Sequence, residues 1–119
     1  MGGRSYFAFM RNSESIVRSA PRLKTIKAVS SPVRLEILFL LKDPAANFPP
    51  QTDGDLIRDG VCADFIREKL GIAAATASRH LTLLTDAELL IATRTKGWTF
   101  YRRNEPAIQR FTEVLSSEL

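Results

Sequence analysis

Apolar residues recur every three or four positions along much of the chain, the spacing of helices that bury one face. The first such segments predict helices over about 21–30 and 33–42. Ser31 and Pro32 precede the second helix, where the serine hydroxyl can accept from free amides and proline suits the first helical position. Because this helix is apolar almost all round, we expect it to be buried on every side at the centre of the core.

Prolines and glycines interrupt the pattern at 43–60 and predict a long loop there. Helical spacing resumes at 61–70, and Gly71 is a typical helix terminator. After a three-residue turn, another helix is expected over 74–85. Its buried side is predicted to consist of Ala74, Ala77, Leu81 and Leu84.

β-Branched and aromatic residues dominate 89–95 and 98–103, and Lys96-Gly97 separates the two segments. They predict a β-hairpin with a tight two-residue loop. Asn104 is expected to cap a last helix that runs to the chain end. The fold class is therefore mainly α, with a two-stranded hairpin between the last two helices.

A short helix, a turn containing glycine, a second helix and a basic hairpin together describe a winged helix-turn-helix. In that fold the second helix lies in the major groove of DNA, and the hairpin, called the wing, follows the backbone. Short or forked donors lie on or beside the outward face of the helix at 74–85, and the hairpin holds no acid. The predicted DNA-contacting residues are Thr76, Ser78, Arg79, His80, Thr82, Arg94, Lys96 and Arg102. For His80 the alternative is a packing role at the edge of the buried stripe.

Three segments resemble the ArsR/SmtB family of transcriptional repressors. Residues 31–38 (SPVRLEIL) look like the family's Pro-x-Arg-x-x-Ile-Leu opening. Residues 76–84 (TASRHLTLL) are similar to its recognition segment and 97–102 (GWTFYR) to its wing, so the resemblance covers about 23–110. It implies a repressor that binds a double-stranded DNA operator as a homodimer, with the first and last helices forming the dimer interface.

Three departures from the family's pattern bear on DNA binding. Ala73-Ala74-Ala75 stands where Ser-Gln-Pro is common, which removes a helix cap and a reader of adenine. Thr82 replaces a frequent lysine, so one phosphate contact is missing. Glu88 replaces the glycine that usually ends the recognition helix, which puts the left-handed turn there in doubt. We therefore expect an operator preference unlike that of better-matched members.

Many members of this family sense metals through a Cys-x-Cys pair on the helix before the recognition helix. Cys62 falls on the first of these positions, Asp64 on the second and Arg67 on a third. One thiolate, a hard carboxylate and a cation do not make a soft trithiolate site. The family's other common metal site lies on the last helix, and residues 104–119 contain no His. We therefore expect no metal and no other cofactor, and the inducing signal stays open.

Cys62 itself supports two interpretations. A lone cysteine beside Val61 and Phe65 is typical of a small core residue. Near the start of a helix, whose positive end favours a thiolate, it would instead be an oxidant-sensitive thiol. The second interpretation predicts a thiol-redox-responsive regulator that uses Cys62.

Composition narrows the classes of function. The 119 residues carry 17 Lys and Arg against 13 Asp and Glu, and the net charge of +4 fits a nucleic-acid partner. One His, one Cys and the lack of a Gly-rich phosphate loop argue against an enzyme. A winged helix that docks on proteins is the remaining alternative, although a protein-docking face would not keep the wing free of acids. We favour a sequence-specific DNA-binding regulator.

The chain divides into an N-terminal tail at 1–14 and one DNA-binding domain at 15–119. The aromatic residues Tyr6, Phe7 and Phe9 belong either to a frayed tail or to a segment that docks on a partner subunit. No apolar run is long enough to cross a membrane, and no secretory signal is present. A single cysteine fits a reducing compartment, so a cytoplasmic location is expected.

Overall fold

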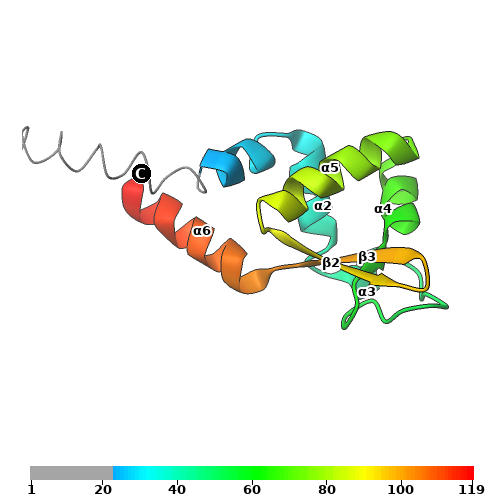
Figure 1. The fold of residues 1–119 in the computed structure, drawn as a ribbon. Helices are drawn as coiled ribbons and strands as arrows, with labels where there is room; N and C mark the ends of the chain where they lie inside the picture. Colours follow the sequence, from blue (N-terminus) through cyan, green and yellow to red (C-terminus); the bar gives the residue numbers. More distant parts are fainter. Residues whose placement is uncertain (1–22) are drawn as a thin grey trace, which may run out of the picture.

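The fold is known from a computed structural model, which describes residues 23–119. The predicted tail, its aromatic cluster and the division at residue 15 lie outside the described residues. Residues 23–29 are helical, in agreement with the helix expected there. The elements that follow, shown in Figure 1, are α2 (Pro32–Leu40), α3 (Pro44–Asn47), β1 (Val61–Cys62), α4 (Ala63–Leu70), α5 (Ala74–Asp86), β2 (Leu90–Thr95), β3 (Trp98–Arg103) and α6 (Glu105–Glu118).

Helix α2 begins as predicted but is not buried on every side. The Ser31 hydroxyl accepts from the amide of Arg34 at 3.3 Å, and Pro32 opens the first turn. Leu35 and Phe39 are nevertheless 52% and 66% exposed. They lie four residues apart on one face of the helix, whereas Ile37, Leu38 and Leu40 are buried.

The segment 43–60 is not a plain loop. Asp43 caps the four-residue helix α3 by accepting from the amide of Ala46 at 3.4 Å. Further along, Gln51 donates to the carbonyl oxygen of Gly60 at 3.0 Å and accepts from the amide of Cys62 at 2.6 Å. These bonds hold the segment against the sheet.

A third strand adds to the predicted hairpin. Val61 and Cys62 form β1, which pairs antiparallel with β3 through Val61–Tyr101 and Cys62–Phe100, so the strand order is β1-β3-β2. The expectation of a helix from residue 61 is therefore wrong by two residues. The helix starts only at Ala63, because the backbone of β1 is engaged with β3.

The helix-turn-helix unit and the hairpin agree with their predictions. Gly71 ends α4 with a φ of 68°, in the left-handed region. Lys96 and Gly97 have φ of 53° and 82°, which is the signature of the tight hairpin turn that matches strand twist. Asn104 caps α6 by accepting from the amide of Ala107 at 3.4 Å.

Helices α2, α4 and α5 gather on one side of the sheet, and α6 leads away from it (Figure 1). The inner face of α5 carries Ala77, Leu81 and Leu84, whereas Ala74, expected on that face, is exposed. The largest fully buried side chains of the described residues are Ile37, Ile66, Leu81, Leu84, Leu89 and Val61. The core thus packs against the inner face of α5 and leaves its outer face exposed to solvent.

Candidate nucleic-acid interface

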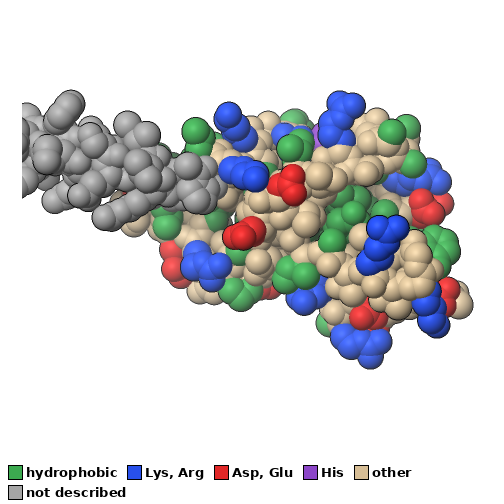
Figure 2. Space-filling model, in the orientation of Figure 1, with side chains coloured by type: hydrophobic (Ala, Val, Ile, Leu, Met, Phe, Trp, Pro, Cys, Tyr) green, Lys and Arg blue, Asp and Glu red, His purple; other side chains and the backbone are tan. Residues whose placement is uncertain are grey.

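The outer face of α5 presents the donors that the sequence predicts. Thr76, Ser78, Arg79 and Thr82 are exposed, and His80 is half-buried. Figure 2 shows the single histidine beside basic side chains along the edge that α5 forms. The structure therefore brings these five side chains onto one helix, as a recognition helix requires.

The two hairpin arginines predicted to contact DNA, Arg94 and Arg102, do not share a face of the sheet. Arg94 pairs with Thr99 across the strands, whereas Arg102 pairs with Ile91, and side chains of directly paired residues lie on the same face. Arg94 is therefore on the face of Thr99 and Tyr101, which looks toward α5, and Arg102 is on the other face. Burial raises the pKa of Tyr101, and the cation of Arg94 opposes that rise.

Arg103, the fourth base of the hairpin, is engaged inside the protein. Its side chain is 12% exposed and forms a two-point ion pair with Glu105 at 2.7 and 2.9 Å. A third bond goes to the carbonyl oxygen of Leu38 at 2.9 Å. This guanidinium holds the pKa of Glu105 below its usual value, and it fastens α6 to α2 rather than facing solvent.

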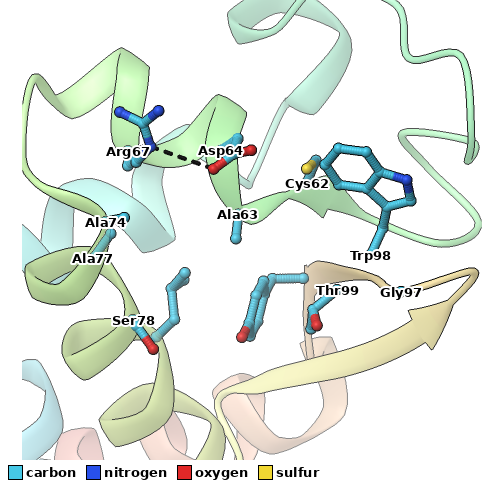
Figure 3. Close-up of a pocket in the computed structure, with 12 residues that line it drawn as sticks. Cys62, Ala63, Asp64, Arg67, Ala74, Ala77, Ser78, Gly97, Trp98 and Thr99 are labelled. Atoms are coloured by element: carbon cyan, nitrogen blue, oxygen red, sulfur yellow. Dashed lines mark hydrogen bonds and ion pairs between the residues drawn. The ribbon is translucent and has the colours of Figure 1, made fainter.

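A hollow of about 340 Å³ separates α5 from β3 (Figure 3). Ser78, Thr99 and Tyr101 line it with hydroxyl groups, and small alanines on α5 leave it open. At its rim Arg67 and Asp64 form an ion pair at 3.3 Å, so two of the three residues at the family's metal positions bind each other.

Cys62 is 9% exposed and lies in β1 at the start of α4. Figure 3 shows its sulfur beside the Trp98 ring. This burial favours the core interpretation over the redox one, because reactive thiols are usually accessible. Within residues 23–119, no group of three or more His, Cys, Asp and Glu side chains is placed to hold a metal ion.

The end of α5 shows that the doubt about a left-handed turn at Glu88 was wrong. Glu88 has a φ of 63°, so the left-handed turn is present although glycine is absent. Such a conformation costs a residue with a side chain about 1–2 kcal/mol. The side-chain amide of Asn104 donates to the carbonyl oxygen of Glu88 at 2.9 Å and holds the turn.

No side chain caps the start of α5. Ala73 has the extended backbone of a capping residue, with φ −68° and ψ 152°, but no side-chain oxygen. Replacing it by serine is expected to raise the free energy of unfolding by about 1 kcal/mol, measured by urea denaturation. Ala75→Ser, inside the first turn, is the control and should give no gain. Equal effects of the two substitutions would contradict the capping explanation.

Sequence reasoning missed one residue of this region, Arg34. Its guanidinium reaches from α2 to the ring of His80, with 2.9 Å between the guanidinium nitrogen and Nδ1. Burial and the cations of Arg34 and Arg79 hold the pKa of His80 below its usual value of 6.5. Arg34 stands in the family-like motif of residues 31–38, but nothing in that motif indicates a partner 46 positions away.

Comparisons with known proteins point to one class of protein. No family model matches the chain. The chain is 38% identical over 97 residues to YbzH of Bacillus subtilis (strain 168), described as an uncharacterized HTH-type transcriptional regulator, and the match covers 82% of this chain and 97% of that protein.

Several solved structures share the fold, and two of them are described as regulators of transcription. One is a homodimeric winged helix-turn-helix DNA-binding domain of Mb0332 from Mycobacterium bovis, described as a possible ArsR-family transcriptional regulator. It has a TM-score of 0.61 and 23% identity, over 87% of this chain and 83% of that one. The other is the transcriptional repressor BigR from Xylella fastidiosa, with a TM-score of 0.54 and 20% identity, over 87% of this chain and 93% of that one. The fold predicted from the sequence is confirmed.

Proposed function

Because this chain belongs to the HTH-type transcriptional regulators, we propose that it is a homodimeric repressor that binds a double-stranded DNA operator and leaves it on a signal. It acts by binding rather than by catalysis, and its place of action is the cytoplasm. One observation carries the proposal: α5 presents Thr76, Ser78, Arg79, His80 and Thr82 outward from a helix whose opposite face is buried.

The proposed complex places α5 in the major groove and the wing along the backbone. Arg79 is the reader of a base edge, because a guanidinium can bond guanine at two points. Arg94 and Lys96 bind phosphates beside that groove. Arg102 was predicted to do the same, but it lies on the opposite face of the sheet, so we assign it the weakest contact of the three.

A second copy of the chain is proposed to cover α6 and the helical segment 23–29. In the single chain, α6 has no buried residue, although Ile108, Phe111, Val114 and Leu115 form an apolar stripe on it. Leu23 and Ile26 on the first segment are also exposed. Both stripes need a partner surface, and the homodimeric state of Mb0332 supports this arrangement.

Phe111→Asp is expected to separate the subunits. A charge at the centre of an apolar interface typically costs at least about 2 kcal/mol, which raises the dissociation constant of the dimer by about 30-fold or more. Sedimentation over a range of concentrations measures the change. Gln109→Asp, on the exposed face of the same helix, is the control and should leave the dimer intact. A wild-type chain that sediments as a monomer at every concentration contradicts the dimer.

Selection of bound fragments from genomic DNA tests the function as a whole. We expect one enriched, pseudo-palindromic sequence with half-sites centred about one helical turn apart. Enrichment without a common sequence would refute sequence-specific regulation. Failure to retain DNA, together with tight binding to a protein, would favour the protein-docking alternative.

A further inference from the structure

Arg34 joins three parts of the molecule through one guanidinium group. Its Nε donates to the carbonyl oxygen of Ala28 at 2.6 Å, and a terminal nitrogen donates to that of Lys27 at 3.3 Å. The other terminal nitrogen lies 2.9 Å from Nδ1 of His80 in α5. The two carbonyl groups belong to the last turn of the helical segment 23–29, where the negative end of the helix favours a cation.

This contact determines which nitrogen of the His80 ring carries the proton. A guanidinium group has only hydrogens to donate and no lone pair to accept. Nδ1 of His80 must therefore accept from Arg34, and the single proton of the neutral ring sits on Nε2. Among residues 23–119 no other group bonds the ring, which is half-exposed on α5, so Nε2–H is available to an outside acceptor.

We propose that Arg34 is a positioning residue of the DNA interface, which holds His80 as a neutral Nε2–H donor for a phosphate oxygen of the operator. The proposal rests on the placement of α5 against DNA given above. In this arrangement three of the five N–H donors of Arg34 are directed at the two carbonyl groups and at the ring, and Arg34 is assigned no contact with DNA. The same three bonds tie the recognition helix to the end of the first helix.

The charges around the ring support the neutral form. Arg34 from α2 and Arg79 from α5 are the charged groups that act on His80, and both are cations. A proton added to Nδ1 would face the Arg34 guanidinium, so protonation breaks the contact. Because the pKa of His80 is lower in the folded chain than in the unfolded one, the unfolded chain takes up the proton first. Stability is then expected to fall as the pH drops below about 6.5.

The first experiment is nitrogen NMR of the full chain with labelled histidine and without DNA. Since the chain has one His, the spectrum reports His80 alone. We expect protonated Nε2 and bare Nδ1 at neutral pH. In Arg34→Gln we expect a mixture of the two neutral forms and a titration midpoint closer to 6.5. A proton on Nδ1 of the wild-type protein, or an unchanged spectrum in Arg34→Gln, would overturn the proposal.

The second experiment compares two substitutions of the ring on the selected operator. In His80→Asn the side-chain oxygen can still accept from Arg34, but the shorter side chain has no donor at the Nε2 position, so affinity should fall about tenfold. His80→Gln restores a donor near the Nε2 position but offers Arg34 no acceptor at the Nδ1 position, so it should recover only part of that loss. Because a neutral donor releases no counterion, the salt dependence of binding should not change in either variant.

Arg34→Gln on the same operator completes the design, because it removes both the positive charge and the fork that serves three acceptors. We expect weaker binding with an unchanged salt slope. A slope reduced by about one would mean that Arg34 binds a phosphate directly, and the positioning role would be wrong. The wild-type protein could fail to retain DNA although its NMR spectrum is as expected. That result would refute the proposed function and the phosphate contact, and it would leave only the conclusion that Arg34 fixes the tautomer of His80.

Discussion

Gly60→Ala is expected to destabilise the protein by roughly 3–5 kcal/mol, the largest effect of a single methyl group that the fold predicts. A Cβ at this position would clash with the carbonyl oxygen of Tyr101, and φ is +109°, where side chains are strained. The obstacle is the backbone of β3, which cannot rotate aside. The strain and the clash both act on the pairing of β1 with β3. Urea denaturation measures the loss.

Gly71→Ala is the matched control for this prediction. Gly71 also has a positive φ, 68°, but no atom lies within 4 Å of the position that a Cβ would take. The substitution should therefore cost only the left-handed conformation, about 1–2 kcal/mol. Equal losses at the two glycines would show that β1 and β3 do not approach as closely as the structure has them.

Arg79→Ala is expected to weaken operator binding by about 1–3 kcal/mol, which is roughly 5- to 150-fold. The loss should depend on sequence, because a guanidinium that reads a base edge loses its preferred base pair when it is removed. Titration of the selected operator and of variants changed at single base pairs measures both effects. At one position of the operator, the affinity of the variant should no longer depend on which base pair is present.

Substitutions of two further arginines distinguish base recognition from phosphate binding. Arg94→Ala should weaken binding to all sequences alike and reduce the salt slope by about one, as expected of a phosphate contact. Arg102→Ala should change the slope less, since its side chain lies on the other face of the sheet. Lys42→Ala is the control, because Lys42 is exposed and acts on Glu105 at the start of α6. An Arg79 variant that loses affinity equally for every sequence would contradict base reading.

The elements that sequence reasoning found are those whose stability is local. Apolar spacing predicts the helices at 32–40 and 74–86, and a serine-proline cap also marks the start of the first one. β1 was missed because two residues are too few to show an alternation of apolar and polar positions. Its partner β3 also lies 38 or more positions away in the chain. Four-residue α3 was likewise too short to show a pattern.

The candidate site was predicted in its composition but not in its geometry. Outward positions on α5 follow from helical spacing, so Thr76 and Arg79 could be placed before the structure. The difference between Arg102 and Arg103 could not, because it depends on strand register and on an ion pair with Glu105. The contact of Arg34 with His80 joins distant segments, which no local pattern encodes.

Helix α6 has consequences for how the regulator would respond to its own abundance. Within residues 23–119 none of its residues is buried, and in the proposed dimer its apolar stripe is covered only when two subunits meet. If operator binding requires that meeting, occupancy at low abundance rises with the square of the subunit concentration. A cell that halves its supply of the protein would then lose about three quarters of the repression in that regime, so that dilution by growth acts as a signal of its own.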